Sequence, residues 1–211
     1  IFVGLPYVYR GKLYNVAAAL SEGKILGFVP KRFIPNYNEH EESRYFAEGM
    51  SEPVEVSFED GVTFPMGTKL LFSCAEMPEL KIGVEICEDL WVPQPPSISH
   101  ALNGATVIVN LSASAEMTGK DLYRKELVGG QSGRLVCGYI LANAGDGEST
   151  QDLVFSGHNM IAEDGHILAE AKRFINETIY AELDVYKIDA ERRRMSTFEA
   201  RFDGYTEVSF S

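Results

Sequence analysis

The chain has 211 residues, of which 45% are hydrophobic and 24% are charged, proportions that fit one globular domain with a full core. Its formal net charge of −12, with no basic run longer than the arginines at 192–194, argues against nucleic acid and anionic membrane as partners. Cys74, Cys87 and Cys137 are widely spaced and give neither a disulfide framework nor paired metal ligands, so we expect a cytoplasmic protein. No apolar stretch approaches the ~20 residues of a membrane span.

The first part of the chain reads as a series of strands with one irregular insertion. Apolar and β-branched runs bounded by turn signals predict strands at 1–6, 13–20, 24–29, 54–58, 62–64, 69–74 and 80–86. The Asp-Gly signal in Glu59-Asp60-Gly61 predicts a hairpin between the fourth and fifth of them. Residues 30–46 mix charged and aromatic residues between prolines, which indicates a loop that leads into a short helix at 39–46.

Helices and strands alternate in the second part. We expect helices at 95–103, 121–136 and 184–195, the first with prolines in its first turn and Gly104 after its end. Strands are expected at 106–111, 137–143, 158–162, 166–170 and 178–183, followed by an extended tail. The first of these strands is apolar on both faces, so it should be a central strand covered on both sides. This order predicts an α/β layered domain.

The apolar run 80–86 ends abruptly at Cys87, which is followed by Glu88, Asp89, Trp91 and a proline cluster. This pattern predicts a buried strand that stops at a sharp bend. A side chain on such a bend projects from the sheet edge beside the next backbone N–H, so a nucleophile and an oxyanion donor come together. The alternative is that Cys87 is a buried small hydrophobe, as most free cysteines are.

Several segments, taken in chain order, resemble one known family. They are Phe28-Val29-Pro30-Lys31 with Pro35-Asn36-Tyr37 and Glu42, the run from Gly83 to Trp91 with its prolines, Asn110-Leu111-Ser112-Ala113-Ser114, and Gly147-Glu148-Ser149-Thr150 with Asp152. Together they resemble the nitrilase superfamily, and most closely the glutaminase domain of glutamine-dependent NAD synthetases. The resemblance implies a nitrilase-like α-β-β-α sandwich, with residues 1–211 as a single carbon-nitrogen hydrolase domain.

The family's catalysts are a glutamate, a lysine and a cysteine, so the resemblance implies Cys87 as nucleophile and Lys31 as the lysine. A thiol is mostly protonated at neutral pH and needs a base and a nearby cation to act as a thiolate. Lys31 would pair with the charge that develops on the substrate carbonyl oxygen, beside the backbone N–H of Glu88. Glu42 matches a second glutamate that orients the lysine or the substrate. Its alternative is a helix-surface acid within a charged run.

The substrate side of the site is also implied by the resemblance. Tyr37 matches a substrate-side aromatic, and Glu88 belongs to the same side. Ser112, Ser114 and Lys120 fall where the family's glutaminases hold the amino and carboxylate groups of glutamine. A zwitterion needs one acceptor and one cationic donor, and Lys120 would give a point charge rather than an arginine fork.

Other polar residues receive weaker roles. Trp91, Glu148 and Asp152 lie close to the motif residues, and we expect them to shape the site. Four scattered histidines lack ligand spacing, so we assign no metal: His40, His100, His158 and His166.

The resemblance departs from the family at the general base, a glutamate that the family carries on an earlier strand. Glu22 is the only acid before Lys31, and its turn signal, Ser21-Glu22-Gly23, makes a solvated turn residue the better interpretation. We therefore expect an N-terminally truncated domain that lacks its first strand or strands and a helix, holds two of the three catalysts and is inactive alone. A synthetase domain is not expected within residues 1–211.

The implied function is hydrolysis of the glutamine amide through a cysteine thioester. The ammonia would go to a synthetase domain of the same polypeptide, for NAD biosynthesis from deamido-NAD. No phosphate-cradling glycine loop is present, so no cofactor is expected here, and ATP and Mg would belong to the synthetase domain. The alternatives are another nitrilase-type amidase and a non-catalytic assembly or regulatory module. The family pairs protomers, which implies a homo-oligomer.

Overall fold

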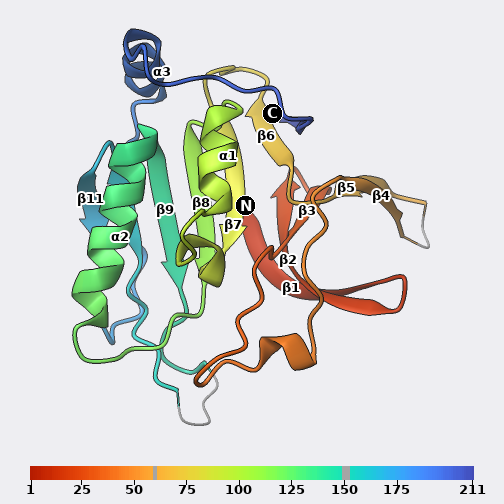
Figure 1. The fold of residues 1–211 in the computed structure, drawn as a ribbon, viewed down its shortest axis with the longest axis vertical. Coiled ribbons are helices and arrows are strands. Elements are labelled where there is room, and N and C mark those ends of the chain that lie inside the picture. The colour runs from red at the N-terminus through yellow and green to blue at the C-terminus, as the bar shows by residue number, and fades with distance from the viewer. Residues whose placement is uncertain (59–60, 149–152) are drawn as a thin grey trace.

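The computed structural model describes residues 1–58, 61–148 and 153–211, whose strands form two facing sheets (Figure 1). The five-stranded sheet has the order β1-β2-β3-β5-β4 and the seven-stranded sheet the order β11-β10-β9-β8-β7-β6-β12. The first sheet consists of β1 (Phe2–Tyr9), β2 (Lys12–Ser21), β3 (Lys24–Pro30), β4 (Val54–Ser57) and β5 (Thr63–Met66). The second consists of β6 (Leu70–Cys74), β7 (Lys81–Ile86), β8 (Val107–Ser112), β9 (Gly138–Asn143), β10 (Met160–Glu163), β11 (His166–Glu170) and β12 (Thr206–Phe210).

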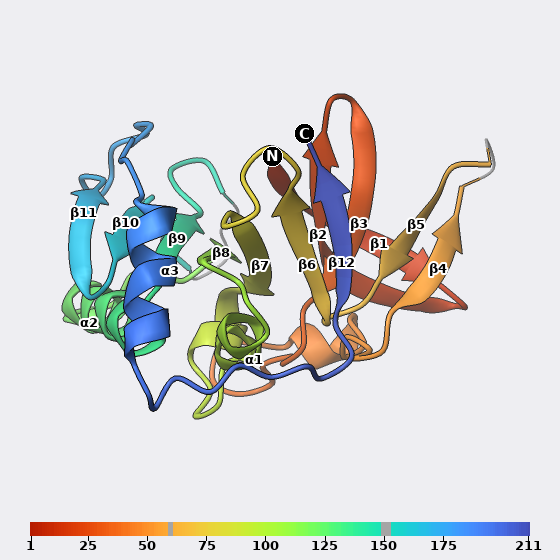
Figure 2. The ribbon, with the colours of Figure 1, turned by 90° about the horizontal axis from the view of Figure 1, so that it is seen from above.

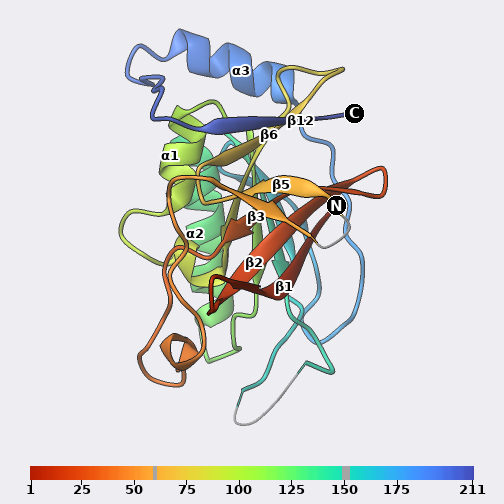
Figure 3. The same ribbon diagram turned by 90° about the vertical axis from the view of Figure 1, so that its right-hand side faces the viewer.

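The helices lie on one face of the seven-stranded sheet and across its end (Figures 1 and 3). They are α1 (Pro96–Leu102), α2 (Lys120–Leu135) and α3 (Val185–Arg194), with short 3-10 helices η1 (Glu42–Arg44) and η2 (Cys87–Leu90). α1 and α2 pack on one face of this sheet, and the five-stranded sheet packs on the other. The α/β class and the facing sheets are therefore confirmed, and the described residues make three of the four expected layers.

β8 shows why the seven-stranded sheet is the centre of the molecule. Val107 and Val109 belong to the cluster between the sheets, whereas Ile108 belongs to the cluster under α1 and α2. Successive side chains of a strand point to opposite faces, so a strand covered on both sides is expected to be apolar on both, as β8 is apart from the buried Asn110. The prediction of a doubly covered central strand is thus confirmed.

Two glycines explain how the helical layer approaches the sheet. A Cβ on Gly83 of β7 would lie 2.8 Å from the Cβ of His100, so only glycine lets α1 pack this closely. A Cβ on Gly133 of α2 would lie 3.1 Å from Gly165 in the β10–β11 turn. α2 has three glycines, Gly129, Gly130 and Gly133, and the last of them allows this close contact within the chain.

Some predicted elements differ in the structure. The strand expected at 178–183 is wrong: this segment is irregular, Leu183 packs between the sheets, and the next N–H, of Asp184, donates to the carboxylate of Glu163 at 2.6 Å. The helix expected at 39–46 is reduced to η1. β4 and β5 pair antiparallel as predicted, but Glu59 and Asp60 of the hairpin signal lie outside the described residues.

The C-terminal end returns to the core. Beyond α3 the chain crosses the end of the seven-stranded sheet as an extended segment and then enters β12, which lies beside β6 (Figure 2). β12 pairs with β6 in parallel. The tail is therefore an edge strand and not simply extended. Of the helices that the structure describes, none has the length and apolar character needed to cross a membrane.

His100 on α1 is a buried neutral imidazole with two partners. Nε2 lies 3.0 Å from the carbonyl oxygen of Val84, so it carries the proton, and Nδ1 lies 2.8 Å from the hydroxyl of Tyr205. Burial lowers the pKa of His100 from 6.5 to about 4. The folded chain therefore binds fewer protons than the unfolded chain between these values, and the stability that neutral His100 contributes is lost as the pH falls through this window.

We expect the free energy of unfolding of the wild type, relative to His100→Gln, to fall by about 3 kcal/mol between roughly pH 7 and pH 4. Glutamine has no charge to gain, so it serves as the reference across the whole range. Urea titrations of both proteins at each pH measure the difference. A difference that stays constant with pH would show that His100 does not titrate as described.

Candidate active site

The predicted bend is present at the end of β7. The backbone of Ile86 is extended, Cys87 has φ of +47°, and η2 starts there. The left-handed region is unfavourable for a residue with a Cβ, so contacts must hold Cys87 in it. Cys87 is half-buried, and its left-handed backbone turns the chain from β7 into η2. The prediction of a strand that stops at a sharp bend is confirmed.

Asp89 ties this bend to the segment that carries Lys31. Its buried carboxylate accepts the N–H of Ile86 at 2.9 Å, the N–H of Phe33 at 2.8 Å and the N–H of Arg32 at 3.1 Å. Burial raises the pKa of Asp89 to about 7, while the three N–H donors act in the opposite direction. One side chain thus fixes the distance between the cysteine bend and the lysine segment.

Replacing Asp89 by alanine should lower the free energy of unfolding by about 3 kcal/mol, because buried N–H groups on two segments lose their acceptor. Asp89→Asn keeps one acceptor oxygen and should lose less. Asp146→Ala, at an exposed loop position, is the matched control and should change little. Chemical denaturation measures all three, and an Asp89→Ala protein as stable as the control would refute this role.

Lys31 is buried and forms an ion pair with the partly exposed Glu42. The Lys31 side chain is 1% exposed, and its Nζ donates to both carboxylate oxygens of Glu42 at 2.7 Å. Because a buried ammonium group needs a compensating anion, the position of Glu42 on η1 determines where Nζ lies. Glu42 is therefore an ion-pair partner of Lys31 as well as a partly exposed acid of η1, and its role in orienting the lysine stays a prediction.

A cavity of about 400 Å³ lies where the two sheets and the bend meet, and it brings four of the predicted site residues together. They are Cys87 from the bend, Lys31 after β3, Glu42 from η1 and Ser112 at the end of β8. The other described residues that line it come from strands of both sheets and from the loops after β8 and β9: Gly4, Asn15, Ile86, Leu111, Ala113, Ala142, Asn143, Ala144 and Glu148. The described lining therefore includes a thiol, an ammonium group and two carboxylates.

Tyr37 and Glu88 contact each other next to the bend. The Tyr37 hydroxyl donates to the Glu88 carboxylate at 2.6 Å, and this hydrogen bond is the main reason that the pKa of Tyr37 is raised to about 12. A negative charge on Cys87 adds to the same shift, so Tyr37 lies within electrostatic reach of the thiol. Neither residue is among those that line the cavity, and the predicted binding role of the pair stays a prediction.

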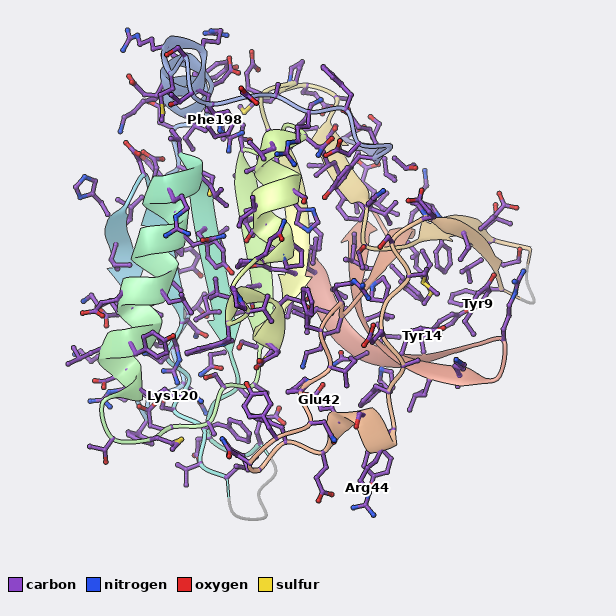
Figure 4. The ribbon with its side chains drawn as sticks, in the orientation of Figure 1. Tyr9, Tyr14, Glu42, Arg44, Lys120 and Phe198 are labelled. Atoms are coloured by element: carbon purple, nitrogen blue, oxygen red, sulfur yellow. The ribbon has the colours of Figure 1, made fainter. Side chains whose placement is uncertain are left out.

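Ser114 and Lys120 do not line this cavity. Ser114 is buried, and its hydroxyl accepts from Arg124 Nη2 at 3.3 Å. Lys120 begins α2, with Nζ 5.2 Å from the centre of the Trp91 ring, and Figure 4 shows it at the foot of α2, apart from Glu42. Their assignment to substrate binding stays a prediction that this arrangement does not support directly.

Sequence reasoning missed several residues that organise the site. Asp89 was part of the motif, but an acidic residue beside a predicted bend does not by itself indicate that its carboxylate accepts backbone N–H groups from another segment. Asn110 did leave a signal, because it interrupts the apolar run of β8. Asn15 and Arg124 left none, since their positions depend on strand register and helix packing.

Glu22 is a solvent-exposed turn residue, as predicted. It is exposed, has φ of +49° and sits in the turn between β2 and β3. It is not among the residues that line the cavity. In the motif around Glu148, the residues Ser149, Thr150 and Asp152 lie outside the described residues. Within the described residues, no group of three His, Cys, Asp or Glu side chains is arranged to hold a metal ion.

Comparison with known proteins shows the family. The carbon-nitrogen hydrolase family model matches residues 1–193. The chain is 41% identical over 214 residues to a glutamine-dependent NAD(+) synthetase from Mycobacterium tuberculosis and 30% identical over 207 residues to the one from Homo sapiens. These alignments cover 100% and 92% of this chain but only 31% and 29% of the relatives.

Solved structures agree with this result. A glutamine-dependent NAD(+) synthetase from Cytophaga hutchinsonii superposes with a TM-score of 0.71 at 31% identity, over 82% of this chain and 27% of that one. Saccharomyces cerevisiae Nit3, of the nitrilase superfamily, superposes over 92% of this chain and 62% of that one with a TM-score of 0.67, and its 23% identity shows the fold alone. The chain therefore belongs to the carbon-nitrogen hydrolase family.

Proposed function

We propose that this domain hydrolyses the side-chain amide of glutamine and that the ammonia serves a synthetase domain that makes NAD from deamido-NAD. The observation that carries the proposal is the pocket in which Cys87, Lys31 and Glu42 meet, in a chain 41% identical to a named glutamine-dependent NAD(+) synthetase. The chain spans about three tenths of the length of such relatives, so the synthetase partner belongs to the proposal.

The proposed reaction starts with attack of the Cys87 thiolate on the amide carbon of glutamine. Lys31 Nζ and the backbone N–H of Glu88 would stabilise the negative charge on the carbonyl oxygen, and such a donor is worth about a hundredfold in rate or more. Ammonia leaves when the C–N bond breaks and its nitrogen has taken a proton. Water then cleaves the thioester, which releases glutamate and restores the thiol.

The proton of the thiol needs an acceptor that later protonates the leaving nitrogen. Glu42 has both carboxylate oxygens on Lys31, so its proposed task is to place the lysine and to balance its charge. The base is then a different glutamate, as the family resemblance implies. Among the described residues, Glu148 is the other carboxylate that lines the pocket, and it is exposed.

Ammonia release tests this proposal. The full-length gene product is incubated with glutamine, asparagine, carbamoyl compounds and simple aliphatic amides, with and without the synthetase substrates. The proposal predicts release from glutamine and little from the others. Release only from another amide would identify a different amidase, and no release from any amide under both conditions would favour a non-catalytic module.

The assembly and the site's lack of a cofactor are proposed on the same basis. We propose that the domain works as part of a homo-oligomer and binds neither ATP nor NAD itself. Light scattering of the full-length product and calorimetric titration of the separate domain with both nucleotides test these two statements. A monomer that is fully active, or binding of either nucleotide by the separate domain, would contradict them.

A further inference from the structure

Three polar side chains of neighbouring strands lie together in the buried layer beneath the cysteine bend. Glu85 of β7, Asn110 of β8 and Tyr139 of β9 are each 1% exposed or less. The register pairs Glu85 with Asn110, and β9 is the next strand. All three face the helical layer, where a polar atom without a partner costs about 1–3 kcal/mol. Each of the three side chains therefore needs hydrogen-bond partners within this layer.

The three side chains connect the bend to a buried carboxylate. The N–H of Cys87 donates to Asn110 Oδ1 at 2.9 Å, and Asn110 Nδ2 donates to the hydroxyl of Tyr139 at 3.1 Å. The Tyr139 hydroxyl in turn donates to Glu85 Oε1 at 2.5 Å. Every donor in this series points away from Cys87 and toward Glu85.

Glu85 sets this direction in its ionised form, because a carboxylate accepts and cannot donate. Burial raises the pKa of Glu85, and its hydrogen bonds with Tyr139 and Ser97 act in the opposite direction by stabilising the carboxylate. Its second oxygen accepts the N–H of Ser97 at 2.8 Å, in the first turn of α1. Tyr139 must then give its proton to Glu85, which leaves its lone pairs for the Asn110 amide. The amide is thereby held with its oxygen toward Cys87, the one orientation that accepts the N–H of the bend.

Holding that N–H has a consequence for the thiol. Cys87 has φ of +47°, which is unfavourable for a cysteine, and relaxation would rotate its Cβ and carry Sγ to another direction. In its present conformation the residue lines the pocket together with Lys31. Anchoring the Cys87 N–H therefore keeps the thiol in the pocket that holds the ammonium group.

We propose that Asn110, Tyr139 and Glu85 are positioning residues that hold the Cys87 bend with its thiol in the pocket. They touch neither Lys31 nor the proposed substrate position, so they act only through the bend. For turnover, the proposal rests on the glutaminase function proposed above. The reactivity of the thiol can be measured without that function, so an experiment can reject the glutaminase and keep the positioning role, or the reverse.

The first test uses Tyr139→Phe, which removes one oxygen and keeps the ring. Without that oxygen, Asn110 Nδ2 loses its acceptor and the amide is free to turn. We expect kcat for glutamine to fall roughly ten- to hundredfold, while KM changes less than about threefold. Tyr14→Phe is the matched control, because Tyr14 is a buried tyrosine in the other sheet. An unchanged kcat in Tyr139→Phe would overturn the proposal.

The second test needs no turnover. Within residues 1–211, a Cys74→Ser background leaves Cys87 as the one thiol that is not buried, since Cys137 is fully buried, and mass spectrometry of the Cys87 peptide follows its alkylation. A nearby cation favours the thiolate, so a thiol that turns away from Lys31 should react with iodoacetamide half-maximally at a higher pH. The other titratable groups near the thiol in the described part of the chain are Glu42 and Glu148 in the pocket and Tyr37 and Glu88 beside the bend, and they are the same in every variant.

The alkylation profile separates the outcomes. We expect Tyr139→Phe to move the half-maximal pH upward and to slow the reaction at neutral pH, with Tyr14→Phe unchanged. A shift without glutamine hydrolysis by the parent protein would retain the positioning role and reject the glutaminase. Hydrolysis with an unchanged profile would reject the positioning role alone.

A double-mutant cycle tests whether the residues act as one series. Asn110→Ala removes the acceptor of the Cys87 N–H directly, so adding Tyr139→Phe should then cost nothing further in alkylation rate. Two effects that multiply would show independent contributions to packing and contradict the proposal. If either variant fails to fold, Glu85→Gln takes its place. This change keeps the shape and volume of the side chain but introduces an amide donor, so the direction of the hydrogen bonds between Glu85, Tyr139 and Asn110 can reverse.

Discussion

Replacing Cys87 by alanine should abolish the proposed ammonia release from glutamine and leave the fold intact. Loss of the nucleophile in covalent catalysis typically costs about 10⁴-fold or more, so the variant should fall to the background rate. Cys87 is half-buried and its thiol has no hydrogen-bond partner within the described residues, so truncation removes little packing. Its free energy of unfolding should therefore stay within about 1 kcal/mol of the wild type.

The control for this experiment is another half-buried cysteine. Cys74→Ala at the end of β6 removes a thiol outside the pocket and should retain full activity. The full-length gene product is used, with ammonia measured by a coupled assay. Activity retained in Cys87→Ala but lost in Cys74→Ala would place the nucleophile elsewhere and refute the site.

Replacing Lys31 by methionine should lower kcat by about a hundred- to a thousandfold. The ammonium group is the pocket's only described cation, and it is buried, so nothing else replaces it at the carbonyl oxygen. Lys31→Arg should not restore the rate, because a planar fork cannot occupy the place of a compact ammonium group against Glu42. Steady-state kinetics with glutamine measures both variants.

The surface of the chain supplies a matched control for Lys31. Lys69 and Glu52 form an ion pair of the same length, 2.7 Å, but Glu52 is 76% exposed. Lys69→Met should therefore leave kcat unchanged. The double variant Lys31→Met with Glu42→Gln should recover stability, because no unpaired carboxylate remains, but it should recover no activity. Recovery of activity in the double variant would show that Lys31 serves only to neutralise Glu42.

The sequence predicted the bend and the general architecture because these depend on local patterns. The apolar run that ends at Cys87 and the doubly apolar β8 could be recognised without a partner in view. The resemblance connected Lys31, Glu42 and Cys87, and the structure brings these three into one cavity. Their chemical roles depend on protons and substrate and stay predictions.

What the sequence did not reveal depends on contacts between distant segments. Asp89 accepts hydrogen bonds from the backbone N–H groups of residues more than fifty positions away. Almost every residue carries such an N–H group, so the residue types do not indicate which ones will donate. The predicted strand at 178–183 failed for a related reason, since apolar residues such as Leu183 can pack between sheets without pairing. Glu85 looked like one polar residue in a strand until the strand register placed Asn110 and Tyr139 next to it.

The central claim is that Cys87 attacks the amide carbon of glutamine, and a reactive glutamine analogue tests it most directly. A diazoketone analogue that carries its reactive carbon at the amide position is incubated with the full-length protein, and the labelled peptide is identified by mass spectrometry. We predict one label per chain, on Cys87, with protection by glutamine but not by asparagine. A label on Cys74 or Cys137, or continued ammonia release from fully labelled protein, would contradict the claim.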